Sequence, residues 1–165
     1  MQFINLFLMY SILGYSLETL SSLITNPGFN SGMLRGPWTP IYGIAILIIY
    51  FINKKLEMLN LKKWQKVILF FIIITTLLTL LEFICGNLIY IFLNKTYWDY
   101  TDFKFNLGKF ITLEISLIWG VGATLINYLL LNKSLKIAKK ISKFITILLS
   151  LVFIGDIAYY ILERI

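Results

Sequence analysis

Long apolar stretches alternate with short polar segments along the whole chain. A helix needs about 20 mostly apolar residues to cross the hydrocarbon core of a bilayer. By this measure we predict five transmembrane helices, over residues 3–24, 38–53, 67–93, 110–131 and 144–162. The second is short for a span, and the third is long enough to tilt. The pattern therefore predicts an all-α polytopic helical bundle, with residues 1–165 forming a single transmembrane domain.

Composition supports this fold class. Of the 165 residues, 59% are hydrophobic and only 14% are charged. A soluble domain would be about half apolar and a quarter charged, so lipid is needed to cover part of the apolar surface. The net charge of +7 is compatible with nucleic-acid binding. However, the lysines lie in short segments between apolar stretches, which is the pattern of membrane orientation. We therefore expect the lipid bilayer as a partner and no nucleic acid.

The lysines indicate an orientation. Segments 53–66 and 132–143 each hold five of them, which leaves 15 − 10 = 5 basic residues elsewhere. These ten lysines are Lys54, Lys55, Lys62, Lys63, Lys66, Lys133, Lys136, Lys139, Lys140 and Lys143. Basic segments stay in the cytoplasm, so we expect the N-terminus inside and the C-terminus outside. The stretch 136–143 could also lie on anionic lipid, although orientation alone accounts for it. The excess of Lys over Arg is typical of AT-rich bacterial genomes, so we expect a multi-pass protein of the bacterial cytoplasmic membrane.

Four acidic residues lie within the predicted spans: Glu18, Glu82, Glu114 and Asp156. A lipid-facing acid at a helix centre costs about 2.5–3.5 kcal/mol on insertion scales, so such residues usually face a bundle interior or an aqueous cavity. Polar and small residues also recur at steps of three and four, which places them on single helix faces. The three faces are Ser11, Gly14, Tyr15, Glu18, Ser22 and Thr25; Thr75, Thr79, Glu82, Gly86 and Tyr90; and Thr112, Ser116, Trp119, Gly120, Ala123 and Asn127. We expect the first two faces to meet or to share a cavity, although close helix packing alone would also explain the small residues.

Under the inferred orientation the four acids fall in the outer halves of their helices. Two loops rich in Gly, Pro and aromatic residues, 32–43 and 97–109, lie on the same side. Irregular backbone at membrane depth is tolerated only where protein or a cavity covers it. We therefore predict an outward-facing ligand site lined by Glu18, Arg35, Tyr42, Glu82, Asp99, Asn106 and Glu114. In the alternative interpretation Arg35 and Asp99 are solvated loop charges, and the aromatic residues form an interfacial belt.

Several short motifs carry a family resemblance. They are Tyr10-Ser11-Ile12-Leu13-Gly14-Tyr15 with Glu18, Gly36-Pro37, Pro40-Ile41-Tyr42-Gly43, Leu81-Glu82, Trp98-Asp99-Tyr100-Thr101, Phe105-Asn106 and Trp119-Gly120. In this order and spacing the chain resembles the family called putative ABC-transporter type IV, small permease-like membrane proteins of bacteria. It departs from the family pattern at Ser31, where the pattern has Arg, and at Lys109 and Phe110, where it has Arg and Ile. The resemblance implies a role in transport and names no substrate.

Three functions remain open at this point. The first is a permease-like subunit of an ABC-type transporter. Since the chain has no G-x-x-x-x-G-K-[ST] motif for binding nucleotide phosphates, this function needs a separate cytoplasmic ATPase, docked on the Lys-rich segments. Five helices are few for one permeation path, which favours a homo- or hetero-oligomer. The second is a non-catalytic accessory or sensor protein with an outer-side ligand pocket. The third is a membrane-embedded enzyme that uses Glu18, Glu82 and Asp99, but the chain has no His and no nucleophile motif. We expect no cofactor and no metal site.

Overall fold

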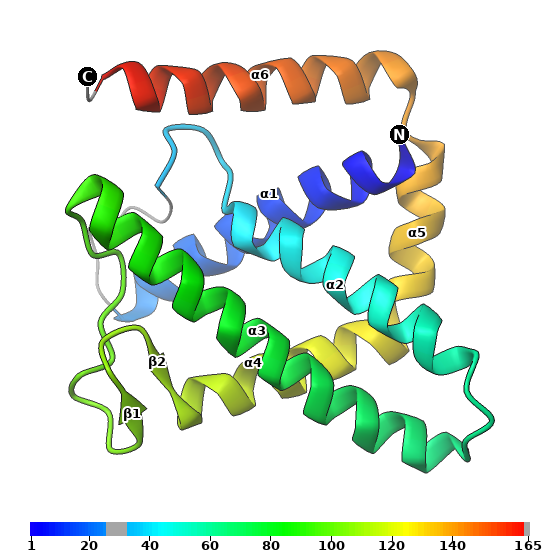
Figure 1. The fold of residues 1–165 in the computed structure, drawn as a ribbon. Helices are drawn as coiled ribbons and strands as arrows, with labels where there is room; N and C mark the ends of the chain where they lie inside the picture. The colour runs from blue at the N-terminus through cyan, green and yellow to red at the C-terminus, as the bar shows by residue number, and fades with distance from the viewer. Residues whose placement is uncertain (26–32, 164–165) are drawn as a thin grey trace. The chain divides into compact units, whose positions relative to one another are not determined.

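The computed structural model describes residues 1–25 and 33–163, and it is almost entirely helical (Figure 1). The helices are α1 (Gln2–Thr25), α2 (Pro40–Glu57), α3 (Lys63–Leu93), α4 (Leu113–Leu125), the π-helical turn η1 (Ile126–Leu130), α5 (Leu131–Lys140) and α6 (Lys143–Leu162). Two strands of two residues each, β1 (Asn106–Leu107) and β2 (Ile111–Thr112), pair antiparallel. The all-α prediction is confirmed. Ser31, Gly32, Arg164 and the side chain of Thr25 lie outside the described residues.

Four of the described helical stretches are long and apolar enough to cross a membrane. They are Gln2–Ser22 of α1, α3, the continuous stretch Leu113–Lys140, and α6. The second predicted span corresponds to α2, whose last turns carry Lys54, Lys55 and Glu57. Its apolar part, residues 40–52, extends only about 20 Å at 1.5 Å per residue, against about 30 Å of hydrocarbon. Four of the described helices thus support a membrane protein by their length and composition, and a fifth crossing by α2 stays a prediction.

One predicted loop proves to be helical. The sequence predicted a connection over residues 132–143, whereas the structure has helix α5 over Leu131–Lys140. This segment, Leu-Asn-Lys-Ser-Leu-Lys-Ile-Ala-Lys-Lys, consists largely of good helix formers. Leu131, Ser134 and Ala138 recur at steps of three and four and are buried. The polar composition of the segment concealed an amphipathic helix.

Contacts within the chain divide it into two compact units. The first comprises Met1–Leu47 and Lys133–Ile165, and the second comprises Ile48–Asn132. The second unit is continuous in sequence, whereas the first joins the two ends of the chain. The single transmembrane domain predicted from the sequence stays a prediction.

In the first unit, Asn5 of α1 holds the end of α5 and the start of α6. Its amide nitrogen donates to the carbonyl oxygen of Ala138 at 2.9 Å, and its amide oxygen accepts from the Thr146 hydroxyl at 2.6 Å. All three residues are buried. The Tyr10 and Ser134 hydroxyls form a further buried hydrogen bond of 2.9 Å between α1 and α5. Helix α5 is therefore fixed against α1 by polar side chains as well as by apolar packing.

The same unit contains a close crossing of α1 with the start of α2. A Cβ at Gly14 would lie 2.3 Å from the Tyr42 ring, and one at Gly43 would lie 2.4 Å from the Ser11 hydroxyl. The backbone N–H of Thr39 donates to the carbonyl of Ser11 at 3.0 Å. Only glycine allows the two helices to approach this closely. The polar stripe predicted on the first helix is thus partly a packing face.

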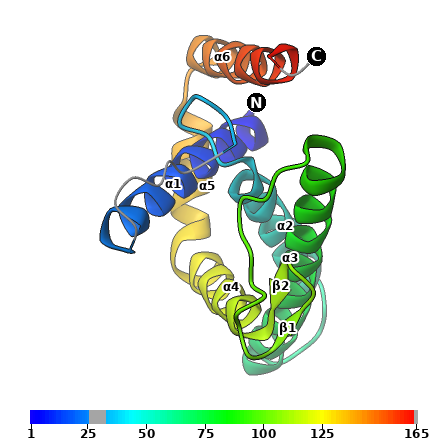
Figure 2. The ribbon, with the colours of Figure 1, turned by 90° about the vertical axis from the view of Figure 1, so that its left-hand side faces the viewer.

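The second unit is built on the antiparallel pair α3 and α4, with the β1–β2 hairpin against the end of α3 and the start of α4 (Figures 1 and 2). On α3 every fourth residue is buried, namely Phe70, Ile74, Leu78, Glu82 and Gly86. Most of the predicted small and polar face is buried, namely Thr112 at the end of β2, Ser116, Gly120 and Ala123 on α4, and Asn127 on η1. The Asn127 amide nitrogen donates to the Asn53 side-chain oxygen at 3.0 Å.

Two glycines of α4 provide a matched test of this packing. A Cβ at Gly120 would lie 1.9 Å from the Thr75 hydroxyl oxygen and 3.1 Å from Thr75 Cβ, whereas a Cβ at Gly122 meets nothing within 4 Å. We expect Gly120→Ala to destabilise the protein by about 1–3 kcal/mol, because α3 and α4 must separate. Gly122→Ala should be neutral or stabilise by up to about 1 kcal/mol. Unfolding in detergent measures both, and equal effects of the two substitutions would contradict the close α3–α4 contact.

Candidate functional site

Glu82 is a carboxylate buried on α3, a helix long and apolar enough to cross a membrane. Glu82 is 4% exposed and belongs to the row of residues on α3 that are buried at every fourth position. The Tyr100 hydroxyl donates to Glu82 Oε1 at 2.8 Å from the loop that follows α3. The Trp119 side chain of α4 also approaches the carboxylate. Within the described part of the chain, Glu82 Oε2 has no partner in hydrogen-bonding geometry. A buried acid of this kind needs a further polar or cationic group, which makes it a candidate ligand-binding residue.

The loop over residues 94–112 positions Tyr100. The Tyr100 backbone N–H donates to the Lys109 carbonyl at 2.8 Å, and the Trp98 indole N–H donates to the Phe110 carbonyl at 3.2 Å. The Phe110 ring packs on Gly86, where a Cβ would lie 2.5 Å from Phe110 Cγ. The loop therefore rests directly on the α3 backbone, one turn beyond Glu82.

The hairpin within this loop has a defined register. Asn106 pairs with Thr112 and Leu107 pairs with Ile111, which leaves a three-residue turn. Gly108 in the turn has φ +72°, a left-handed conformation that residues with a Cβ rarely adopt. The Gly-Lys motif of the sequence thus forms the tip of the hairpin.

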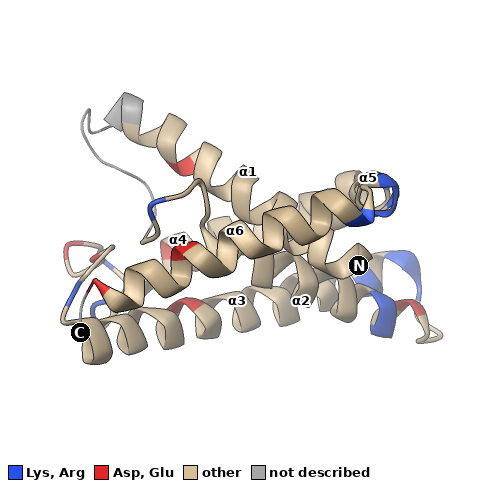
Figure 3. Ribbon diagram, turned by 90° about the horizontal axis from the view of Figure 1, so that it is seen from above, with Lys and Arg blue, Asp and Glu red and all other residues tan. Residues whose placement is uncertain are grey.

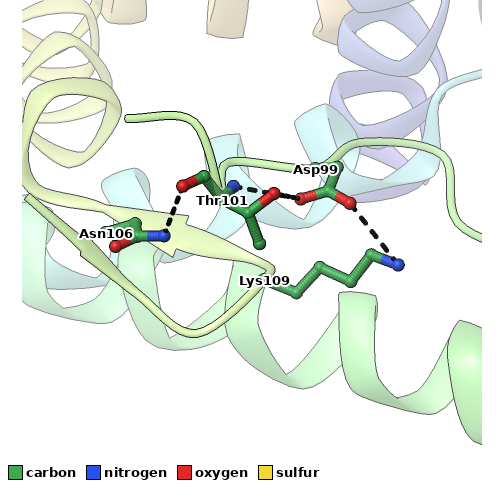
Figure 4. A network of polar contacts seen from close by, with 4 residues as sticks. All are labelled: Asp99, Thr101, Asn106 and Lys109. Atoms are coloured by element: carbon green, nitrogen blue, oxygen red, sulfur yellow. Dashed lines mark hydrogen bonds and ion pairs between the residues drawn. The ribbon is translucent and has the colours of Figure 1, made fainter. Parts of the chain in front are cut away.

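Asp99 organises a polar network at the surface of the loop (Figure 4). It accepts hydrogen bonds from the Thr101 backbone N–H at 3.0 Å and the Thr101 hydroxyl at 2.8 Å, and it lies 3.4 Å from the Lys109 ammonium. The Asn106 amide nitrogen donates to the Thr101 carbonyl at 3.0 Å. The Thr101 N–H, the Thr101 hydroxyl and Lys109 together hold the pKa of Asp99 below its ordinary value. Asp99 and Asn106 are therefore brought together, as parts of one loop.

Glu114 lies in the first turn of α4, where the helix dipole favours a negative charge. It accepts the Phe105 backbone N–H at 3.3 Å and the Thr112 hydroxyl. The Phe105 carbonyl in turn accepts the Leu113 backbone N–H at 3.1 Å. Glu114 thus joins the start of α4 to the segment before β1.

The remaining predicted site residues belong to the first unit. Arg35 forms an ion pair with Glu163, and its guanidinium lies 4.6 Å from the centre of the Tyr159 ring. Its partner is thus an acid near the end of the chain rather than one of the predicted site acids. Tyr42 packs on Gly14, and Glu18 is half-buried on α1. The predicted meeting of Glu18 with Glu82, and one site containing all seven residues, stay predictions.

Three contributors were not among the predicted site residues. Tyr100 and Trp119 were assigned to motifs, but nothing in the sequence connected either one to Glu82. Asp156 was recognised as an acid within a span, and it accepts the Gly36 backbone N–H at 2.9 Å. A backbone donor carries no residue-type signal, so this contact could not be predicted. In the described residues, no three His, Cys, Asp or Glu side chains are grouped so that they could hold a metal ion.

These features define the class of protein: a helical membrane protein whose buried acid Glu82 and half-buried acids Glu114 and Asp156 are contacted by its connecting segments. The family described as "Putative ABC-transporter type IV" matches residues 5–161, and the chain belongs to this family. The resemblance inferred from the motifs is thereby confirmed and extends over nearly the whole chain. Comparisons with curated proteins and with solved structures give no match.

The hydrogen bond between Tyr100 and Glu82 can be measured by a double-mutant cycle. Tyr100→Phe removes the donor and leaves a buried carboxylate oxygen unpaired, so we expect a loss of about 1–3 kcal/mol in unfolding free energy. In a Glu82→Leu background the same substitution should cost much less, because the acceptor is gone. Thermal unfolding in detergent gives all four values. Additive effects would show that the two side chains do not interact.

The Asp99 network predicts a pH dependence. Because its pKa is lowered in the folded chain, the network stabilises the loop above the ordinary Asp value and loses this effect as pH falls through the folded pKa. Thr101→Val removes the hydroxyl donor and keeps the backbone N–H. We expect it to raise the pKa of Asp99 toward its ordinary value of about 3.9. Carbon-13 NMR titration of the aspartate carboxyl groups measures this shift, and an unchanged Asp99 would contradict the assigned cause.

Proposed function

We propose that the chain is a permease-like subunit of an ABC-type transporter with an outward-facing polar site. The observation that carries the proposal is the contact between Glu82 and Tyr100. It joins a buried carboxylate of a spanning helix to the loop that contains the Asp99 network. A ligand that approaches this loop would therefore be within one side chain of a buried charge. Family membership supports transport as the purpose of this arrangement.

The position of Glu82 along α3 supports the outward direction. Lys63 and Lys66 lie in the first turn of the helix, and the cytoplasm is the expected side for them. From Lys66 to Glu82 an untilted helix rises about 24 Å, which leaves about 6 Å to the far edge of a 30 Å hydrocarbon core. Tilt would bring Glu82 closer to the centre but keep it in the outer half unless the tilt exceeds roughly 50°. The proposed site thus lies where the loop 94–112 can reach it.

A transporter of this kind needs a source of energy, which we assign to a separate cytoplasmic ATPase. The lysines at the end of α2 and the start of α3 offer a docking region on the expected side. Lys54, Lys55 and Lys63 are exposed there. An assembly of several chains fits the small number of spanning helices in each.

The orientation can be tested within the second unit alone. In a Cys85→Ser background, single cysteines replace Lys104 in the loop and Lys63 at the other end of α3, both of which are exposed. We expect a membrane-impermeant maleimide to label the Lys104→Cys protein in intact cells and to label Lys63→Cys only after lysis. The opposite labelling pattern would place the loop in the cytoplasm and exclude an outward-facing site.

Transport itself is tested in cells that lack the chain and carry either the wild type or a variant. We expect the wild type to change the uptake or export of at least one solute in an isotope-labelled panel. Glu82→Gln should abolish this flux although its amide still accepts from Tyr100, and Gly122→Ala, which meets nothing, should retain it. A photo-crosslinker at position 63 should capture an ATP-hydrolysing subunit. A solute that binds the purified chain without any change in flux would favour the sensor function.

A further inference from the structure

Helix α5 has two distinct faces. Leu131, Ser134 and Ala138 are buried, and the last two contact α1 through Tyr10 and Asn5. Lys133, Lys136 and Lys140 also recur at steps of three and four, so they share the opposite face, and all three are exposed. Figure 3 shows the basic residues gathered on α5. The helix therefore presents lysines away from the face that the protein covers.

These lysines have no acidic partner in the part of the chain that the structure describes. The two ion pairs found there involve Arg35 and Lys109. α5 itself contains no Asp or Glu, and Ile137 is exposed beside its basic face. Exposed lysines with an apolar neighbour are typical of helices that lie in the headgroup region of a membrane.

The neighbouring helices place α5 at that depth. α4 and η1 together contain 13 + 5 = 18 residues, which extend about 27 Å and nearly cross the hydrocarbon core. α6 then begins at Lys143, after a cap in which the Ser142 hydroxyl accepts the Ile145 N–H at 3.3 Å. α5 is thus the last part of the candidate span Leu113–Lys140, beyond the length that the hydrocarbon core needs, and the candidate span α6 follows it.

We infer that the basic face of α5 binds the headgroups of anionic phospholipids in the leaflet that it borders. The charge of the face, its freedom from acidic neighbours and the exposed Ile137 each fit a lipid surface better than an aqueous loop. The contacts of Asn5 and Tyr10 hold the helix in place, so the lysines are presented without a change in fold. This inference does not depend on the proposed transport function.

The test compares lipid retention by the full chain after purification with equal amounts of phosphatidylglycerol and phosphatidylcholine. Native mass spectrometry counts the bound lipids. We expect the wild type to retain the anionic lipid preferentially, and a triple variant Lys133→Gln, Lys136→Gln, Lys140→Gln to lose this preference at least tenfold. Each lysine near an anionic surface contributes a factor of about five. The matched control removes the same charge at Lys54, Lys55 and Lys63, where Glu57 lies among the lysines, and should change the preference less than twofold.

Replacement of the same three residues by Arg should keep the preference, because the charge is retained. It also separates lost binding from misfolding, and the unfolding temperature of each variant provides a second check. Equal retention of the two lipids by the wild type would overturn the inference. So would a glutamine variant that keeps the lipid preference of the wild type.

Discussion

Polar groups that lie among apolar helices must find their partners within the chain, since lipid offers none. Three acids on the candidate spans illustrate how this protein meets the constraint. Glu82 accepts the Tyr100 hydroxyl, Asp156 accepts the Gly36 backbone N–H, and Glu114 accepts the Phe105 backbone N–H. In each case a donor comes from a connecting segment, and for Glu82 the Trp119 side chain of α4 adds a contact from another helix. The loops are therefore part of the solution to burying charge, and their conformations are coupled to the helices that carry the acids.

This coupling gives the loop 94–112 its form. Tyr100 reaches Glu82 because its own backbone is held by Lys109, and Lys109 in turn pairs with Asp99. The loop can lie close to α3 because Gly86 leaves room for the Phe110 ring. Leu81-Glu82 on α3 and the loop segments Trp98-Asp99-Tyr100-Thr101 and Gly108-Lys109 thus form one contact system. A change in the Asp99 network should thus alter the position of Tyr100 and its hydrogen bond to Glu82. Such coupling is expected of a ligand-binding loop.

The fold could be predicted from apolar run length because hydrocarbon thickness sets a minimum helix length. The prediction lost accuracy where length or composition was marginal, as in α2, whose apolar part is short, and α5, whose lysines concealed a helix. Burial of Glu82 was predicted from the cost of exposing an acid to lipid. Its hydrogen-bond partner Tyr100 could not be predicted, because helical periodicity relates only residues that lie on helices and Tyr100 lies in a loop. Arg35 was predicted to line one site with Glu82. Its ion pair with Glu163, 128 residues away in sequence, is a contact that no local pattern encodes.

Asn5 is a buried amide that links three helices, α1, α5 and α6. A polar residue near the start of an apolar helix looks unfavourable in isolation. Here its amide nitrogen donates to the Ala138 carbonyl at the end of α5, and its amide oxygen accepts from the Thr146 hydroxyl at the start of α6. The last carbonyl groups of a helix have no hydrogen-bond partner within the helix. In a turn between two helices, water would otherwise have to donate to them. Because the Asn5 side chain supplies this donor from α1, the turn between α5 and α6 can be compact. α5 is thereby held against α1, with the lysines of α5 on its opposite face. The same rule that draws loop donors to the acids thus also sets which face of α5 carries the exposed lysines.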